Sequence, residues 1–258
     1  MRDTDVTLVG EWLTKCLGRS TITVLRTLDI SRGSGCQVWD CETVTAEGPG
    51  SVVLKTYTAG FDDYSGLGPA DTARKHALAL AELPALGVPT PRCLGWVHAG
   101  GEAALVMQRV MAKPWSRQTR VHAARVLARL HLVQLAELSD ELATLVSRST
   151  PNRERLGEVR GEPPAREHTL QHGDYFSVNI AVTAEGVCVL DWDLLALGDP
   201  MWDLGFLLEA DPNVGEREAE EVIHAYQSLR PVDEARLRWQ RDCWKAYWAA
   251  RDSWQHTG

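Results

Sequence analysis

The sequence predicts an α+β protein with a small, β-rich N-terminal lobe and a larger, mainly helical C-terminal lobe. Three runs of strand-forming residues lie close together before residue 60, and two of them flank a glycine loop. Near residue 110 the pattern changes to long helical periodicity. The 258 residues, 44% of them hydrophobic, can bury a substantial core. We therefore expect one lobe over residues 1–107 and the other over residues 108–258.

In the first lobe, apolar spacing predicts helices over residues 6–17 and 71–86. Asp71 is the expected N-cap of the second helix. Strands are predicted over residues 21–28, 38–45, 51–57, 92–96 and 103–110. Gly33-Ser34-Gly35 forms the glycine loop between the first two strands, and the third strand carries Lys55.

In the second lobe, a long helix is predicted over residues 118–146. The polar residues 149–168 are expected to form a surface loop. After residue 214 the pattern predicts two helices that divide near Pro231.

Charge and composition exclude several classes of protein. The net charge is −8, and the 27 Lys and Arg residues are scattered, which argues against a nucleic-acid partner. The N-terminus has no signal-peptide pattern, and no apolar run approaches the roughly 18 residues of a transmembrane helix. The six cysteines lack zinc spacing and indicate reduced thiols. We expect a cytoplasmic protein, monomeric or homodimeric, without a membrane partner.

A β-hairpin is predicted where apolar runs at residues 178–182 and 187–190 surround a turn. Antiparallel pairing about this turn returns Asn179 to a place beside Leu190 or Asp191. Both polar side chains are therefore expected at the open end of the hairpin.

Asp174 lies on the loop that precedes the hairpin, so we expect it over the same open end. The amide oxygen of Asn179 and the carboxylate of Asp191 would suit Mg²⁺, which takes oxygen ligands. A further carboxylate nearby can accept the proton of an attacking hydroxyl. Together with Lys55 and the glycine loop, these are the groups that phosphoryl transfer needs, in the expected chain order.

The chain resembles the aminoglycoside phosphotransferase family, whose relatives include choline kinases and protein kinases. The resemblance extends from about residue 20 to 225. It rests on Leu127-Ala128-Arg129-Leu130-His131, on the loop from His172 to Asn179, on Val189-Leu190-Asp191-Trp192-Asp193, and on Gly198-Asp199-Pro200-Met201-Trp202-Asp203-Leu204. It implies a two-lobed kinase-like fold with ATP or GTP between the lobes and Mg²⁺ as cofactor.

The same resemblance implies a role for each residue of the site. Asp174 would be the catalytic base, and Asn179 and Asp191 would be the metal ligands. Lys55 would contact the nucleotide phosphates, under the loop Gly33-Ser34-Gly35. The hinge that meets the nucleotide base would be formed by Met107, Gln108 and Arg109.

The chain departs from the family on the helix predicted over residues 71–86. The family usually has a Glu there that pairs with the strand lysine, whereas this chain has Arg74-Lys75-His76. Either the register is shifted, or the helix is differently placed, or another acid orients Lys55. The departure also leaves open a non-catalytic, nucleotide-binding pseudokinase.

The acceptor is expected to be a small cationic molecule. Residues 191–221 contain ten acidic side chains and one basic side chain, Arg217. In the resembled family the acceptor cleft lies beside this region, and an acidic cleft favours cations. We expect O-phosphorylation of an aminoglycoside or a similar antibiotic, with contacts from Asp193, Glu209, Asp211 and Trp202. Alternatively, residues 216–221 form a solvated helix face.

Other interpretations stay open. A metabolic kinase of the same fold would act on choline, an amino sugar or another alcohol. A glycosyltransferase would use Asp191-Trp192-Asp193 to bind a metal. Asp193 could also lie beside the metal, whereas His172, Asp203 and His131 are expected to be structural. The last helix contains tryptophans that either pack against other helices or form a cation-binding wall, namely Trp239, Trp244, Trp248 and Trp254.

Overall fold

The computed structural model describes residues 3–18, 22–29, 36–45, 48–58, 65–150, 167–211 and 214–255. The N-terminal part contains a five-stranded antiparallel sheet in the order β1-β2-β3-β5-β4. Its strands are β1 (Thr23–Asp29), β2 (Cys36–Thr45), β3 (Gly48–Tyr57), β4 (Cys93–Ala99) and β5 (Glu102–Gln108). The predicted glycine loop, Gly33-Ser34-Gly35, lies outside the described residues.

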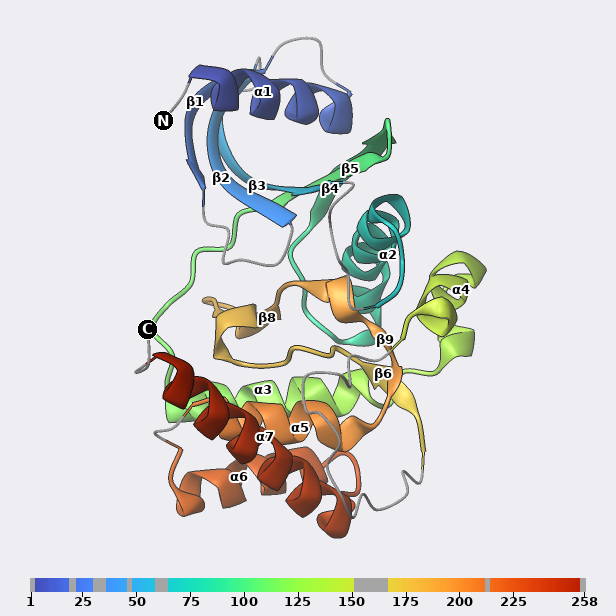
Figure 1. The fold of residues 1–258 in the computed structure, drawn as a ribbon, viewed down its shortest axis with the longest axis vertical. Coiled ribbons are helices and arrows are strands. Elements are labelled where there is room, and N and C mark those ends of the chain that lie inside the picture. The colour runs from blue at the N-terminus through green and yellow to red at the C-terminus, as the bar shows by residue number, and fades with distance from the viewer. Residues whose placement is uncertain are drawn as a thin grey trace.

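Two helices cover opposite faces of this sheet (Figure 1). α1 (Asp3–Leu17) packs on one face through Val9 and Leu13. α2 (Pro69–Glu82) packs on the other face through residues such as Leu80. The sheet therefore has a buried core on each side.

β3 shows how the sheet orients the lysine. Val52 and Leu54 lie in the core under α1, while Tyr57 lies in the core on the α2 side. Because successive side chains of a strand point to opposite faces, Lys55 shares the α2 face with Tyr57. The strand pattern thus directs Lys55 toward the C-terminal part of the molecule.

The C-terminal part is mainly helical (Figure 1). Its helices are α3 (Arg117–Leu130), α4 (Asp140–Arg148), α5 (Pro200–Glu209), α6 (Glu216–Gln227) and α7 (Glu234–Gln255). Two small antiparallel sheets complete it: β6 (Thr169–Gln171) with β9 (Ala196–Gly198), and β7 (Ile180–Val182) with β8 (Val187–Val189). The predicted hairpin and the division of the last helices near Pro231 are confirmed.

Two boundaries expected from the sequence are wrong. The helix predicted over residues 118–146 is divided into α3 and α4, because Ser139 caps a new helix by accepting a hydrogen bond from Leu142 N at 3.2 Å. The N-cap of α2 is Gly68, and Asp71 lies in the first turn instead. Helical periodicity reveals neither the side-chain cap at Ser139 nor the glycine cap at Gly68.

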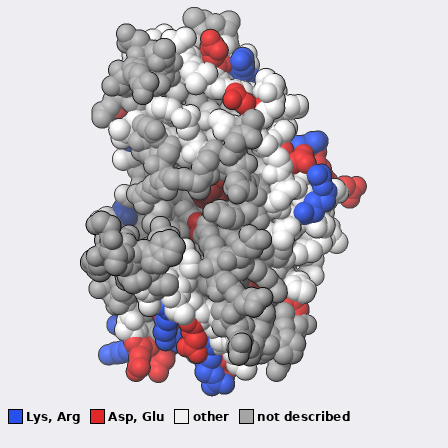
Figure 2. Space-filling view, viewed as in Figure 1, with Lys and Arg blue, Asp and Glu red and all other residues white. Residues whose placement is uncertain are grey.

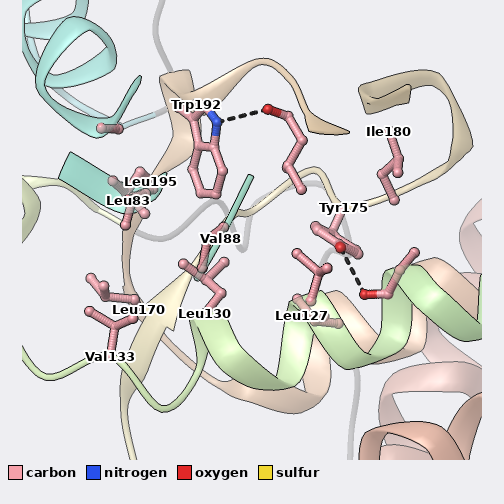
Figure 3. Close-up of a cluster of buried hydrophobic side chains, with 14 of the residues drawn as sticks. Leu83, Val88, Leu127, Leu130, Val133, Leu170, Tyr175, Ile180, Trp192 and Leu195 are labelled. Carbon is pink, nitrogen blue, oxygen red and sulfur yellow. Dashed lines mark hydrogen bonds between the residues drawn. The ribbon is translucent and has the colours of Figure 1, made fainter. Parts of the chain in front are cut away.

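A core of apolar side chains joins the segment after α2 to the C-terminal helices (Figure 3). Leu83 and Val88 lie in the same cluster as Leu130 of α3. Trp192 is fully buried there, and its Nε1 donates a hydrogen bond to Val189 O at 3.1 Å. This anchor fixes the backbone of the two acidic residues on either side of Trp192.

None of the helices in the described part of the chain is long and apolar enough to cross a membrane. All six cysteines are free. Burial raises the pKa of the Cys16, Cys41 and Cys188 thiols to about 12, so these thiols stay protonated at neutral pH.

Candidate active site

The loop that carries Asp174 is held by Asp203 of α5. One carboxylate oxygen of Asp203 accepts the backbone N–H of His172 at 2.7 Å, and the other accepts that of Gly173 at 2.9 Å. Gly173 has a φ of +85°, and a Cβ there would lie 2.8 Å from the Cβ of Leu194, so glycine is required. The expected structural role of Asp203 is confirmed by these contacts.

His172 ties the same loop to the hairpin. Its Nε2 lies 2.8 Å from Leu190 O, and its Nδ1 accepts the backbone N–H of Asp174 at 3.2 Å. Since Nδ1 accepts, the hydrogen is on Nε2, which donates to the carbonyl of Leu190. His172 therefore uses both ring nitrogens to position the loop.

Asn179 bonds directly to Asp174. Its Nδ2 donates to the backbone oxygen of Asp174 at 2.9 Å and to Asp174 Oδ2 at 2.8 Å. With the amide nitrogen directed at Asp174, the amide oxygen is the atom of Asn179 that can ligate a cation.

The hairpin has the register expected from the sequence. Ile180 pairs with Val189, and Leu190 N donates to Asn179 O at 2.8 Å. Asp191 follows with a φ of 60°, and no other non-glycine residue in the described segments has a positive φ. This conformation costs energy for a residue with a Cβ, and such backbone strain concentrates at functional sites.

Lys55 reaches from β3 to the loop that follows β8. Its Nζ lies 2.7 Å from Asp191 Oδ1 and 2.5 Å from Asp193 Oδ2. Burial alone would lower the pKa of Lys55, but the two carboxylates outweigh burial and hold this pKa above its ordinary value. The site therefore keeps a buried ammonium at neutral pH.

Asp193 is held by residues from both the sheet and α2. Its Oδ1 accepts hydrogen bonds from the Tyr57 hydroxyl at 2.8 Å and from His76 Nδ1 at 2.8 Å. Burial opposes the charge of Asp193, yet the Lys55 ammonium and the His76 hydrogen bond lower the pKa of this carboxyl well below its usual value. Asp193 is therefore ionised.

The three hinge residues occupy different environments. The side chain of Met107 is buried in the core, and Gln108 N donates to Arg92 O at 2.9 Å. Arg109 forms an ion pair with Asp40 of β2, with 2.6 Å between Nη2 and Oδ2. As contacts to a nucleotide base, these residues stay a prediction.

Two of the acids predicted to contact the acceptor, Glu209 and Asp211, form ion pairs with arginines far away in the sequence. Arg120 of α3 forms ion pairs with Asp211 and Glu218, and Arg241 of α7 forms one with Glu209. In the view of Figure 2, Lys and Arg are intermixed with Asp and Glu near the lower end of the molecule. The acid count along the sequence therefore overstates the local negative charge.

Trp202 and the last helix form an aromatic cluster beside the loop that carries Asp174. Trp202 is 3% exposed, and its Nε1 donates to Gly173 O at 3.2 Å. Trp244 of α7 stacks on Phe206 with 4.1 Å between ring centroids. Helix packing, one of the two alternatives for these tryptophans, is confirmed for Trp244. As acceptor contacts, Trp202, Glu209 and Asp211 stay predictions.

Two residues of the site, Tyr57 and His76, were not predicted from the sequence. Tyr57 is two residues from Lys55 on the same strand, so alternation places both on one face. His76 lies three residues after Ala73 and four before Leu80, on the buried face of α2. A polar residue at helical spacing from the apolar residues Ala73 and Leu80 was the available signal.

The site combines a strand lysine, bonded to an acid that follows a hairpin, with an Asp–Asn pair on a buried loop. Kinase-like phosphotransferases have the same arrangement. A family model described as "Phosphotransferase enzyme family" matches residues 42–240. The chain belongs to this family, which removes the glycosyltransferase alternative. No curated protein is significantly similar to the chain in sequence.

Solved structures of small-molecule kinases share the fold. Aminoglycoside-3'-phosphotransferase of type VIII has a TM-score of 0.59 at 20% identity, over 92% of this chain and 98% of that chain. Choline kinase LicA from Streptococcus pneumoniae has a TM-score of 0.64 at 15% identity, over 99% and 93%. Amicoumacin kinase hAmiN, in complex with AMP-PNP, Ca²⁺ and Ami, has a TM-score of 0.63 at 13% identity, over 93% and 82%. The kinase-like fold expected from the sequence is confirmed.

Proposed function

We propose that this protein transfers the terminal phosphoryl group of ATP or GTP to a hydroxyl of a small cationic molecule. The observation that carries the proposal is the contact between Lys55 and Asp191, which joins the N-terminal sheet to the loop after the hairpin. In kinase-like enzymes these are the groups that meet the nucleotide phosphates and their metal ion.

The donor atoms at the hairpin fit Mg²⁺. Asn179 and Asp191 offer an amide oxygen and a carboxylate, which are hard oxygen ligands. The Asp191 side chain is 43% exposed, so an ion can reach its carboxylate. When bound, the ion would neutralise charge on the phosphates. We propose Asn179 and Asp191 as its protein ligands.

The remaining residues would act on the acceptor and the donor. Asp174 accepts the proton of the acceptor hydroxyl while that oxygen forms a bond to the γ-phosphorus. The bond from this phosphorus to the bridging oxygen breaks, and the nucleoside diphosphate leaves. Asn179 orients Asp174 through its 2.8 Å hydrogen bond, and Lys55 holds the phosphates. Backbone groups of residues 33–35 and 107–109 would contact the rest of the nucleotide.

The acceptor we propose is an aminoglycoside or a similar cationic antibiotic, in which case modification confers resistance. The net charge of −8 favours cations at long range. Two similar structures are an aminoglycoside phosphotransferase and a choline kinase, and aminoglycosides and choline are both cations. We further propose a cytoplasmic monomer or homodimer whose lobes divide between residues 107 and 108.

The test is a coupled assay of nucleoside diphosphate release across aminoglycosides, macrolides, cyclic peptide antibiotics, choline and amino sugars. We expect turnover of at least one cationic acceptor, and Asp174→Ala should reduce it by about 10²-fold or more with nucleotide binding retained. Asp242→Ala, on an exposed position of α7, is the control. Wild-type rates in Asp174→Ala would refute the assignment of the base, and turnover of only neutral or anionic acceptors would refute the cationic class.

Two alternatives differ in what the same assay returns. A metabolic kinase would turn over choline, an amino sugar or another alcohol but no antibiotic. A pseudokinase would bind nucleotide without Asp174-dependent turnover. The pseudokinase was suggested by the missing helix acid, yet Lys55 has two carboxylate partners, which removes that reason.

A further inference from the structure

We infer that Asp193 is a positioning residue that orients Lys55, in place of a carboxylate on α2. The inference rests on the proposed function, because it assigns how the phosphate-binding lysine of that site is held. In protein kinases the strand lysine pairs with a glutamate on the first helix of the N-terminal lobe. Here the corresponding helix, α2, presents His76, which contacts Asp193, and Asp193 in turn bonds to Lys55.

All the hydrogen bonds of Asp193 hold it in one orientation. Oδ2 bonds to Lys55, and Oδ1 accepts from Tyr57 and His76. An ionised carboxylate only accepts hydrogen bonds, so His76 Nδ1 carries the hydrogen in this contact. Asp193 is thereby fixed by contacts from both β3 and α2. The positions of these two elements therefore determine where Asp193 holds the lysine ammonium.

The two carboxylates on Lys55 have different surroundings. The side chain of Asp191 is 43% exposed, whereas that of Asp193 is 11% exposed. Asp191 is thus accessible to a metal and to phosphates, while Asp193 faces protein groups. Because Asp193 is enclosed by protein groups, it is suited to hold Lys55 in position and not to contact an acceptor.

A metal ion held jointly by His76, Asp191 and Asp193 is disfavoured by the lysine itself, and such a site differs from the one proposed at Asn179 and Asp191. Among the described residues, His76, Asp191 and Asp193 each offer a ligand atom, and these atoms lie within 4.8 Å of one another. The ammonium of Lys55, however, bonds to both carboxylates. The chain therefore supplies its own cation at this position.

α2 is also fixed to the segment that follows Asp193. Lys75 is fully buried, and its Nζ donates to Leu195 O at 3.0 Å and to Ser149 Oγ at 2.8 Å. Two neighbouring residues of α2 thus contact the segment 193–195: His76 bonds to Asp193, and Lys75 bonds to Leu195. A displacement of α2 would move Asp193, and Asp193 would move Lys55.

The first experiment is a double-mutant cycle in urea unfolding, without nucleotide. We expect Lys55→Met and Asp193→Asn each to lower the free energy of unfolding, and the double variant to lower it by less than the sum of the two single effects. The reason is that each single variant leaves one buried partner without its counter-charge. Lys55→Met combined with Asp242→Asn is the matched control and should be additive. Additivity in the Lys55 and Asp193 cycle would overturn the inference.

The second experiment separates positioning from acceptor contact by steady-state kinetics. Asp193→Asn should lower kcat by about 10- to 100-fold with the KM for the acceptor unchanged. Adding His76→Glu to Asp193→Asn returns a carboxylate to α2 and should recover several-fold of this loss. A raised acceptor KM with normal kcat, or no recovery by His76→Glu, would overturn the inference.

Two milder variants apply if Asp193→Asn does not fold. Tyr57→Phe and His76→Gln each alter one contact to Asp193 and should lower kcat by a smaller factor at unchanged acceptor KM. If the wild-type protein has no nucleotide-dependent turnover, the proposed function fails. The unfolding cycle, which needs no nucleotide, then decides whether Asp193 holds Lys55.

Discussion

His131 illustrates how a single buried residue can support the loop that carries Asp174 through a contact to Asp203. Its Nδ1 lies 2.7 Å from the Tyr226 hydroxyl, and its Nε2 lies 3.4 Å from Asp203 Oδ2. Neutral imidazole satisfies this geometry, since the hydroxyl donates to Nδ1 while Nε2–H points toward the carboxylate. Burial lowers the pKa of His131, and nearby Asp203 opposes this shift without reversing it.

This shift predicts a pH dependence of stability. The pKa of unfolded histidine is about 6.5, and that of folded His131 is lower, so below neutral pH the unfolded chain binds a proton that the folded chain does not. The free energy of unfolding should therefore fall as pH falls from about 8 to about 6. Urea unfolding at both pH values measures this drop, and the drop in the free energy of unfolding between them should be smaller for His131→Gln than for wild type. His168→Gln, at an exposed position, is the control. Equal pH dependence in wild type and His131→Gln would contradict the assignment.

Asp191 and Asp193 also show how individual side chains shape the candidate active site. They are separated by one residue, and both contact Lys55. Trp192 between them is buried in the core, which fixes the backbone from which the two carboxylates extend. A motif of three residues thus provides one exposed and one enclosed carboxylate.

At the scale of elements, α2 links the sheet, the hairpin loop and α4. Two adjacent residues of α2 make this link in different ways. Lys75 donates to Leu195 O and Ser149 Oγ from a fully buried position. Arg74 forms an ion pair with Glu141 of α4, and both side chains are more than 40% exposed.

The difference in burial predicts different costs of substitution. Lys75→Met leaves buried acceptors without their donor and should lower the free energy of unfolding by about 1–3 kcal/mol. Arg74→Met removes an exposed ion pair and should cost less than about 1 kcal/mol. Urea unfolding of both variants measures this contrast. If Arg74→Met proved the more destabilising, the role assigned to Lys75 would be wrong.

At the scale of the whole molecule, the proposed nucleotide site takes residues from both parts of the chain. Lys55 comes from the N-terminal sheet, and Asn179 and Asp191 come from the hairpin in the C-terminal part. A ligand that contacts all three would favour the assembled structure over the unfolded chain. Binding should therefore appear as increased thermal stability.

We expect Mg-ATP or Mg-GTP to raise the Tm, with a stabilisation of about 2.7 kcal/mol at a nucleotide concentration of 100 times Kd. Asp191→Ala should lose the Mg²⁺-dependent part of this shift. Differential scanning fluorimetry with nucleotide and EDTA is the control for metal dependence. An unchanged Mg²⁺ dependence in Asp191→Ala would remove this residue from the metal site.

The charge distribution also belongs to this scale. Residues 191–221 are rich in acids, but α3 and α7 bring Arg120, Arg236 and Arg241 against several of them. Arg120 and Glu218 are separated by 98 positions in the chain. Local charge in a folded protein follows from such long-range pairs, so counting charges within one segment was insufficient.

The sequence by itself determined the features that depend on local periodicity. Runs of strand-forming residues predicted the strands, and the turn at residues 183–186 predicted Asn179 beside Leu190 or Asp191, of which the structure shows Leu190. The tertiary structure alone decided which acid meets Lys55, because Asp193 is 138 positions away and its orientation depends on α2. Chain spacing constrains neighbours within an element, whereas contacts between elements depend on how their buried faces pack.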